Sequence, residues 1–318
     1  MEAPLTPASR TLSPHGGERV AESRVRGMII SRTIQDVRAA VCGARDAGRV
    51  IALVPTMGFL HQGHLSLVRV ARANGADFIV VSIFVNPLQF GPNEDFERYP
   101  RDEKRDLKKL EDEEVDLLFL PPVEVMYPPG EDTRVAVGEV SEPLEGERRP
   151  GHFAGVATVV LKLFNIVQPD LAVFGRKDGQ QCVVIERMVR DLDVPLRLVF
   201  GETIREHDGL ALSSRNSYLS KEQRVLAPAL HRALRAGEEA IEHGIHDVEA
   251  VEKLMRKMAA ETPGIEVDYL AVVDPDTFRP AVDFHRDVMV TGAIRIGKTR
   301  LIDNIRISKR AIPHAHIE

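Results

Sequence analysis

Residues 50–64 read VIALVPTMGFLHQGH, and this stretch decides the fold. Its first five residues, Val50 to Val54, are apolar without interruption, which predicts a short strand buried on both faces. The sequence PTMG at residues 55–58 then breaks the strand, and a helical pattern begins near Gly63 or His64. A buried strand that leads directly into a helix is the repeating unit of a parallel sheet covered by helices.

The same alternation continues on both sides of this stretch. Helical patterns cover residues 31–48, 101–113, 152–167 and 179–190, and apolar runs predict further strands at residues 78–85, 115–120, 171–174 and 196–200. We therefore expect an α/β fold, with a Rossmann-like parallel sheet and helices on both of its faces. Residues 121–150 are rich in proline, glycine and glutamate and are too long for an ordinary connection, so they predict an excursion from the sheet.

The pattern changes after about residue 204. Charged helices are expected at residues 220–243 and 246–260, and they precede alternating strands at residues 265–273, 287–296 and 300–307. This order predicts a smaller C-terminal α+β domain.

These patterns divide the chain into two domains and two tails. The Rossmann-like domain is expected over residues 28–203 and the smaller domain over residues 204–310. Residues 1–27 contain almost no apolar periodicity and are expected to be a disordered tail, and residues 311–318 form a second tail.

Composition excludes several classes of protein. The 318 residues include 42 Lys and Arg against 48 Asp and Glu, and a net charge of −6 argues against a general nucleic-acid binder, whose binding face is basic. No apolar run approaches the ~20 residues of a membrane span, so we expect no membrane partner. The two cysteines, Cys42 and Cys182, form no CxxC pair, which suits a reducing cytoplasm and excludes a thiolate zinc site.

The first candidate for chemistry is the His61-x-Gly63-His64 segment that follows the strand. Glycine lets a phosphate come close to the backbone, and the first turn of a helix supplies free N–H groups and partial positive charge. Two imidazoles three residues apart lie on one face of that turn and can donate to phosphate oxygens. The alternative is a pair of surface or metal-binding histidines.

Two further polar segments follow later in the chain. Lys177 and Asp178 come directly after the strand at residues 171–174, where Lys177 suits a phosphate and Asp178 suits a ribose hydroxyl, a metal or a helix cap. Ser213, Ser214 and Arg215 form a short loop whose hydroxyls and guanidinium suit polyphosphate oxygens. The alternatives are a solvated lysine in the first segment and a serine-rich turn that caps a helix in the second.

An HxGH segment combined with a later Ser-Ser-Arg loop is the layout of the nucleotidyl-transferring α/β superfamily, which includes class I aminoacyl-tRNA synthetases. Within it, the chain resembles the pantothenate synthetase (pantoate–β-alanine ligase) family over about residues 28–308. The segments that carry the resemblance are VPTMGFLHQGHLSLV from Val54, VSIFVNPLQF from Val81, GHFAGVATVVLKLFNIVQPD from Gly151, GRKDGQQ from Gly175, DGLALSSRN from Asp208 and TRLIDN from Thr299.

The resemblance implies an activity. The family condenses (R)-pantoate with β-alanine and uses ATP as co-substrate, through a pantoyl-adenylate, to give pantothenate, AMP and pyrophosphate. It also implies Mg²⁺ held mostly by ATP oxygens and water, without a dedicated metal site in the protein. A homodimer and a cytoplasmic location are further expectations.

The resemblance also implies roles for individual residues. His64, Lys177, Ser213, Ser214 and Arg215 would be catalytic, and we interpret His64 first as an electrostatic stabiliser, although the family describes it as a proton donor. The expected ATP contacts are Met57, Gly58, His61, Gly63, His64, Gly175, Arg176, Lys177, Asp178, Ile204, Leu212, Ser213, Ser214 and Arg215. The expected contacts to pantoate and β-alanine are Gln89, Gln181, Pro55, Met57, Asn86, Val156, Val159 and Val160, with Phe84 as a further apolar wall.

Two other functions remain open from the sequence. One is a nucleotidyltransferase of the same superfamily that acts on a different small acid or on a phosphorylated substrate. That reaction predicts basic residues where the neutral Gln89 and Gln181 lie. The other is a nucleotide-sensing protein without activity, which predicts the loss of His64, Lys177 or Arg215, and all three are present.

Residues 178–181 support two incompatible interpretations. In one, Asp178 caps the following helix and Gln181 completes a capping box. In the other, which we favour, Gln181 points into the site and holds pantoate. Gly179 stands where relatives carry a bulky residue, and replacing it by alanine is expected to stabilise the protein if its φ is negative.

Overall fold

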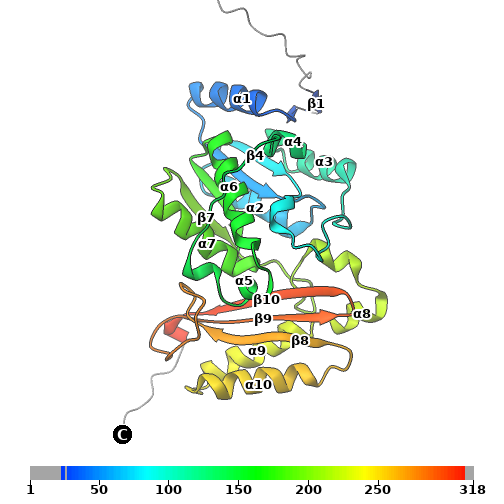
Figure 1. The fold of residues 1–318 in the computed structure, drawn as a ribbon, viewed down its shortest axis with the longest axis vertical. Coiled ribbons are helices and arrows are strands. Elements are labelled where there is room, and N and C mark those ends of the chain that lie inside the picture. The colour runs from blue at the N-terminus through cyan, green and yellow to red at the C-terminus, as the bar shows by residue number, and fades with distance from the viewer. Residues whose placement is uncertain (1–22, 26, 312–318) are drawn as a thin grey trace, which may run out of the picture.

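The computed structural model describes residues 23–25 and 27–311, which form two sheets with their helices (Figure 1). The larger sheet has seven strands, and six of them are parallel. Its strand order is β1 (Ser23–Val25), β2 (Met28–Ser31), β5 (Leu117–Phe119), β4 (Phe78–Ile83), β3 (Ile51–Thr56), β6 (Leu171–Gly175) and β7 (Arg197–Gly201). The expected Rossmann-like α/β architecture is confirmed.

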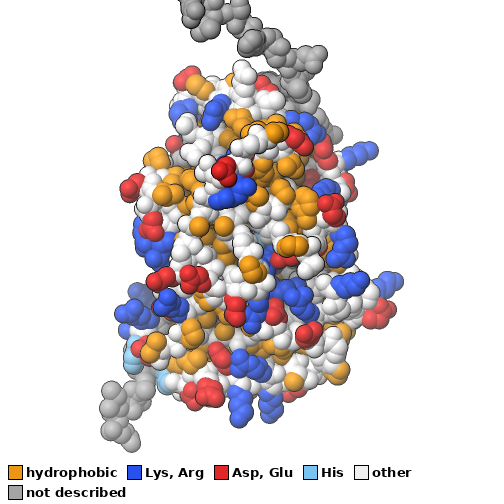
Figure 2. Space-filling view, in the orientation of Figure 1, with side chains coloured by type: hydrophobic (Ala, Val, Ile, Leu, Met, Phe, Trp, Pro, Cys, Tyr) orange, Lys and Arg blue, Asp and Glu red, His pale blue; other side chains and the backbone are white. Residues whose placement is uncertain are grey.

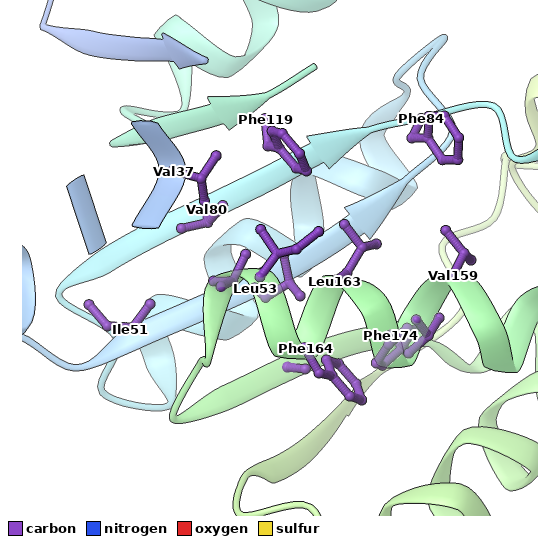
Figure 3. Packing of buried hydrophobic residues seen from close by; sticks show 14 of the residues in the cluster. Val37, Ile51, Leu53, Val80, Phe84, Phe119, Val159, Leu163, Phe164 and Phe174 are labelled. Carbon is purple, nitrogen blue, oxygen red and sulfur yellow. The ribbon is translucent and has the colours of Figure 1, made fainter. Parts of the chain in front are cut away.

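Helices cover both faces of this sheet because its central strands are apolar on both sides. Ile51 and Leu53 of β3 pack with α1 (Ile34–Asp46), α6 (His152–Val167) and α7 (Gly179–Asp191), and Figure 3 shows Leu163 and Phe164 of α6 against this face. The alternate residues Ala52 and Val54 pack on the other face with α2 (Gln62–Ala73) and α3 (Glu103–Asp112).

The excursion at residues 121–150 leaves the sheet, as the sequence predicts, and contains three short elements. These are α4 (Val123–Met126), the 3₁₀ turn η2 (Glu139–Ser141) and α5 (Glu145–Arg148). Glu145 is buried, and it bonds with residues of the second sheet, so the excursion links the two sheets.

The C-terminal unit is an antiparallel sheet with helices on one side. Its strands, in the order β10 (Thr299–Ile307), β9 (Val288–Ile296) and β8 (Glu266–Val273), pack with α9 (Ala229–Glu242) and α10 (Val248–Ala260) in one apolar core. The single helix expected at residues 220–243 is instead α8 (Lys221–Leu226) followed by α9. Pro228, the N-cap of α9, explains the break, since proline cannot donate the bond that a continuous helix needs there.

The N-terminal end of the sheet differs from expectation. No strand is predicted before Val50, yet β2 pairs in parallel with β5. Residues 23–25, which are expected in the tail, form β1 and pair antiparallel with β2. Residues 1–22, 26 and 312–318 lie outside the described residues, so the remaining expectations for the tails are not tested.

The surface carries both charges side by side, as Figure 2 shows for one face. Among the described residues, no helix is both long and apolar enough to cross a membrane.

Candidate functional site

A cavity of about 880 Å³ lies between the carboxyl ends of the parallel strands and the C-terminal unit. This is the edge of an open parallel sheet at which ligands bind. Nearly all of the predicted residues line it. They are Pro55, Met57, His61, Gly63, His64, Asn86, Gln89, Val156, Val159, Val160, Gly175, Lys177, Asp178, Gln181, Ile204, Leu212, Ser213, Ser214 and Arg215.

Gly58 and Arg176 are the two predicted site residues that do not line the cavity. Gly58 has a φ of +84°, and a Cβ there would lie 2.8 Å from Ile83 Cγ2, so this glycine is needed for the turn itself. Arg176 forms an ion pair with Glu202 at 3.1 Å, and its guanidinium lies over the ring of Phe200.

The two histidines of the first segment are held by backbone N–H groups. Nδ1 of His61 accepts a hydrogen bond from the N–H of Gly63 at 3.2 Å, and Nδ1 of His64 accepts one from the N–H of His61 at 3.3 Å. Because both Nδ1 atoms accept, the ring proton of each neutral imidazole is on Nε2. The two rings, whose centroids are 4.0 Å apart, therefore each keep an Nε2–H donor free of these bonds.

Both imidazoles are neutral at neutral pH. Burial lowers the pKa of His61 to about 2, aided by the neighbouring charges of His64 and Lys177. Burial also lowers the pKa of His64 to about 4, aided by Lys177 and Lys109. The pair therefore offers neutral donors to an anion, and Lys177 and Lys109 place positive charge near them.

Asp106 of α3 shapes the loop that carries the histidines. Its buried carboxylate accepts hydrogen bonds from the N–H groups of Phe59 and Leu60, both at 2.7 Å. Phe59 has a φ of +49°, so these two bonds hold a turn that its backbone would otherwise disfavour. Sequence reasoning missed Asp106 because it lies in a helix that reads as an ordinary charged surface helix.

Arg215 is fixed by a carboxylate that the sequence analysis also missed. Nε and Nη2 of Arg215 donate to the two oxygens of Asp95, both at 2.9 Å, and the hydroxyl of Tyr218 donates to the same carboxylate at 3.2 Å. The guanidinium also lies over the ring of Tyr99, which lines the cavity. A bidentate pair of this kind fixes the direction of the remaining guanidinium donors.

The serine loop serves two purposes. Ser213 caps the 3₁₀ turn η4 (Ser214–Tyr218), since its Oγ accepts from the N–H of Arg215 at 3.3 Å. Ser214 Oγ donates to the carbonyl oxygen of Phe59 at 3.3 Å, which ties this loop to the histidine loop. The capping turn that the sequence left as an alternative is therefore present, and the loop lines the cavity as well.

Asn86 is held in one orientation by its own partners. Its Oδ1 accepts from the N–H of Leu88 at 3.3 Å and from the hydroxyl of Tyr127 at 2.8 Å, and its Nδ2 donates to the carbonyl oxygen of Gly155 at 3.1 Å. These partners fix the orientation of the Asn86 amide, because a backbone N–H must face an oxygen and a backbone carbonyl must face a nitrogen.

The fixed amide of Asn86 decides how Gln89 is oriented. Nδ2 of Asn86 also donates to Oε1 of Gln89 at 3.1 Å, so Nε2 of Gln89 faces the other way, toward Met57 Sδ at 3.2 Å. Gln89 and Met57 both line the cavity. Asn86 is predicted to contact the substrate directly, but the hydrogen bonds above use both hydrogens of its Nδ2 and both lone pairs of its Oδ1. The Asn86 side chain therefore holds Gln89.

The predicted apolar wall is present. Phe84, Val156, Val159 and Val160 line the cavity and also belong to the buried core under α6. Figure 3 shows Phe84 and Val159 near the carboxyl ends of the strands.

The capping-box interpretation of residues 178–181 is wrong. Asp178 is the N-cap of α7, but its side chain makes no capping hydrogen bond. Gln181 lines the cavity, in agreement with the interpretation we favour. Gly179 has a φ of −55°, so the condition set for its replacement by alanine is met.

The end of the excursion and the start of α6 border the cavity. Arg148, Arg149 and His152 all line it. Arg149 pairs with both carboxylate oxygens of Glu94 at 2.7 Å, and Nδ1 of His152 lies 2.8 Å from the carbonyl oxygen of Gln89. Nη2 of Arg149 also donates to the carbonyl oxygen of Gln89 at 3.3 Å, so the excursion and α6 both support the Gln89 segment that Asn86 holds.

In the part of the chain that the structure describes, eight Lys and Arg side chains and six carboxylates line the cavity, and five of those carboxylates are paired with arginines, which leaves N–H donors, hydroxyls and cations as the larger set. Within the described residues, no group of three or more His, Cys, Asp or Glu side chains is placed to hold a metal ion. Such a donor set suits an anionic ligand with several phosphate oxygens.

Comparison with known proteins places the chain among close relatives. Residues 29–306 match the family model described as pantoate-beta-alanine ligase. A pantothenate synthetase of Herpetosiphon aurantiacus is 54% identical over 280 residues, which cover 87% of this chain and 99% of the relative. A pantothenate synthetase of Moorella thermoacetica is 52% identical over 278 residues, with 87% and 98% covered.

Solved structures agree in fold. A pantothenate synthetase from Thermus thermophilus is 48% identical, with a TM-score of 0.83 over 89% of this chain and 99% of that one. A pantoate-beta-alanine ligase from Francisella tularensis, complexed with beta-gamma ATP and beta-alanine, is 33% identical with a TM-score of 0.72 over 89% and 98% of the two chains.

Proposed function

The chain belongs to the pantoate–β-alanine ligase family, and from this premise we propose how its cavity performs the reaction. The protein is an ATP-dependent ligase that joins pantoate to β-alanine through an amide bond. The observation that carries the assignment of roles is that the three predicted polar segments meet in one cavity with Gln89 and Gln181.

The reaction proceeds in two steps. The pantoate carboxylate attacks the α-phosphate of ATP, a new carboxyl O–P bond forms, and the bond to pyrophosphate breaks. The β-alanine amine then attacks the acyl carbon, an N–C bond forms, the C–O bond to AMP breaks and the amine loses a proton. The carboxylate nucleophile is already ionised at neutral pH, so the first step needs stabilised phosphate charge and alignment more than a general base.

The phosphates would lie between the histidine loop and the two cationic loops. His61 and His64 donate from Nε2 as neutral groups, while Lys177 and Arg215 supply positive charge. Ser213 and Ser214 line the same side of the cavity. His64 would thus stabilise the developing negative charge by donating a hydrogen bond as a neutral imidazole. This role is more specific than the general electrostatic stabilisation expected from the sequence.

Pantoate would lie against the neutral amides. Gln89 donates from Nε2 to an oxygen of pantoate, and Gln181 offers a second amide without placing a charge near the carboxylate. The wall formed by Phe84, Val156 and Val159 suits the gem-dimethyl group. A substrate carrying its own phosphate would leave that charge facing neutral glutamines, which argues against the alternative nucleotidyltransferase reaction.

Mg²⁺ would accompany ATP. Within residues 23–25 and 27–311, no cluster of carboxylates is placed to hold the ion, so we propose that it is held by phosphate oxygens and water. Asp178, in the Lys177 loop, lines the cavity and would be the carboxylate that faces it. When bound, the ion would neutralise phosphate charge.

We further propose a homodimer that acts in the cytoplasm. The apolar β4 lies between β5 and β3 and offers no free edge to a second copy, so family resemblance is the basis for the dimer. The cytoplasmic location is supported by the two free cysteines, Cys42 and Cys182. Sedimentation at micromolar concentration tests the dimer, and a monomer would contradict it.

The decisive experiment is ATP–pyrophosphate exchange with pantoate alone. Exchange in the absence of β-alanine is expected, because the adenylate forms before the amine is needed. Exchange that required β-alanine would contradict the two-step scheme. Exchange with another acid but not with pantoate would indicate a different substrate.

A further inference from the structure

The segment TRLIDN at residues 299–304 has no role in the proposed reaction, yet its last residue reaches the catalytic loop. Nδ2 of Asn304 donates to the carbonyl oxygen of Arg176 at 3.0 Å and to that of Lys177 at 2.9 Å. The two carbonyls belong to consecutive residues of the 3₁₀ turn η3 (Arg176–Asp178), directly before α7. An amide nitrogen has two hydrogens, so this loop uses both of them.

The neighbouring Asp303 holds the second cationic loop. Its buried carboxylate accepts from Nη1 and Nη2 of Arg205 at 2.6 and 3.0 Å, and from the N–H of Asn304 at 2.8 Å. Arg205 pairs with Ala211 in the short antiparallel bridge that leads into the serine loop. Two consecutive residues of β10 therefore hold both loops that bring cations into the cavity.

We propose that Asn304 is a positioning residue of the reaction, which holds the Lys177 backbone so that the ammonium group faces the phosphates of ATP. This inference rests on the phosphate-binding role proposed above for Lys177. The distance between the Lys177 ammonium and the Asp178 carboxylate is 3.6 Å, which is too long for a hydrogen bond. The position of the ammonium therefore depends strongly on the backbone of Lys177.

The size of the effect follows from the geometry of catalysis. A catalytic group displaced by ~1 Å can lower a rate by about 10²-fold. Without Asn304, the carbonyls of Arg176 and Lys177 lose the donor that fixes them. The loop can then relax while the parallel sheet, which does not include Asn304, stays folded.

Three variants separate hydrogen bonding from packing. Asn304→Asp keeps the size of the side chain but turns an oxygen toward two carbonyl oxygens, whereas Asn304→Ala removes both bonds, and Asn304→Ser leaves one small hydroxyl. The matched control is Arg306→Ala, on the same strand, which removes only an exposed ion pair with Asp287.

The measurement is pantoate-dependent ATP–pyrophosphate exchange by the full chain, with the melting temperature of each variant. We expect Asn304→Asp and Asn304→Ala to lower kcat about 10- to 100-fold, with Asp at least as damaging as Ala, and to leave the KM for pantoate within about threefold. Arg306→Ala is expected to exchange normally. Adding Asn304→Ala to Lys177→Ala should slow exchange by no more than about twofold, because Asn304 acts through Lys177.

Each outcome decides the proposal. Normal exchange by Asn304→Asp would overturn it, as would losses that multiply in the double variant. Failure of all three Asn304 variants to fold would also overturn it, because the side chain would then serve the fold. Normal exchange by Lys177→Ala alone would instead refute the role of Lys177, and that result is distinct because this variant retains Asn304.

Discussion

The two units of the molecule contribute to the cavity in different ways. The parallel sheet supplies its groups from loops that follow strand ends, as with His61 and His64 after β3 and Lys177 after β6. The C-terminal unit supplies side chains from within a strand, as with Arg300 and Asp303 of β10, which line the cavity next to Asn304. The groups in the loops belong to short sequence segments that can be recognised. The groups within β10 are spread along a strand whose neighbouring side chains point to opposite faces.

The alternation of β10 explains how one strand serves two purposes. Leu301 and Ile305 pack in the core with α9 and α10. Arg300 and Asn304 lie on the opposite face of the strand, toward the parallel unit: Arg300 bonds with Glu145, and Asn304 bonds with the Lys177 loop. Since neighbouring side chains of a strand point to opposite faces, the C-terminal sheet keeps its own core and still holds the other unit.

The largest change in stability is expected from breaking the buried ion pair between Arg300 and Glu145, which connects the two units. Arg300 donates to both oxygens of Glu145 at 2.7 and 2.8 Å, and the hydroxyl of Tyr269 donates to the same carboxylate at 2.8 Å. Arg300→Met leaves the Glu145 charge buried without its cation, so we expect the free energy of unfolding to fall by about 3 kcal/mol or more, measured by denaturant titration. Arg306→Ala, which breaks an exposed pair, should change it by less than about 1 kcal/mol. Equal losses of stability in Arg300→Met and Arg306→Ala would contradict the difference expected between a buried and an exposed ion pair.

The same pair makes the connection sensitive to acid. Burial alone would raise the pKa of Glu145, but the bonds from Arg300 outweigh it and hold the pKa below its ordinary value. A group whose pKa is lowered by folding stabilises the fold above its unfolded pKa, and this contribution is lost as pH falls through the folded pKa. We therefore expect stability to fall more steeply below about pH 4.5 in the wild type than in Glu145→Gln. Identical slopes would show that Glu145 is not linked to folding.

His64→Ala tests the loop side of the comparison. Loss of one donor from a preorganised site is expected to lower the exchange rate about 10²- to 10³-fold, or about 3–4 kcal/mol, with the fold intact. His64→Gln, whose amide nitrogen can reach the place of Nε2, should recover part of the rate because the histidine acts as a neutral donor. His243→Ala, at an exposed helix end, is the control and should have no effect. A rate near that of the wild type in His64→Ala would refute its role.

Sequence reasoning reached the histidine and Lys177 loops because each follows a strand, and it reached the serine loop through its Ser-Ser-Arg sequence. The HxGH and Ser-Ser-Arg segments could be found without coordinates, and so could Gln181. Asp95 and Arg300 could not, since their partners lie 120 and 155 residues away along the chain and no local pattern links them.

The errors in the predicted fold have similar causes. β2 contains only four residues, which is too short for a periodicity to be recognised. Pro228 lies inside a pattern that is helical on both sides, and the prediction of a single helix followed the periodicity and disregarded the break that a proline signals. A long element such as α6 agrees with its prediction at both ends, because a continuous apolar pattern defines both of them.

Gln181→Ala has a smaller expected effect and separates binding from capping. We expect the KM for pantoate to rise about tenfold, as for the loss of one hydrogen bond, with a stability change within about 0.5 kcal/mol. Ser220→Ala is the matched control, because Ser220 and Gln223 form a true capping box at α8. That variant should lose about 0.5–2 kcal/mol of stability. A Gln181→Ala enzyme that melts early but binds pantoate normally would reverse the assignment.

The smallest effect is expected at Gly179, where the two units touch. Its φ of −55° suits alanine, and such a change gains about 0.4–1 kcal/mol by restricting the unfolded chain. However, the new Cβ would lie 3.1 Å from Nδ2 of Asn304, whose two bonds to the Lys177 loop resist movement. We therefore expect Gly179→Ala to change the free energy of unfolding by less than about 0.5 kcal/mol, which is less than the sequence alone suggests.

A second background isolates that contact. In Asn304→Ala the amide is absent, so Gly179→Ala should stabilise this variant by the full ~0.4–1 kcal/mol, measured by denaturant titration of the four proteins in the cycle. The stability change caused by Gly179→Ala differs between the two backgrounds by the free energy needed to move the Asn304 amide away from the new Cβ. If Gly179→Ala gained the full amount in the wild-type background as well, the amide would yield freely, and a contact that yields freely cannot hold Lys177 in place. The same cycle thus measures how rigidly a side chain within a C-terminal strand restrains a loop of the parallel sheet.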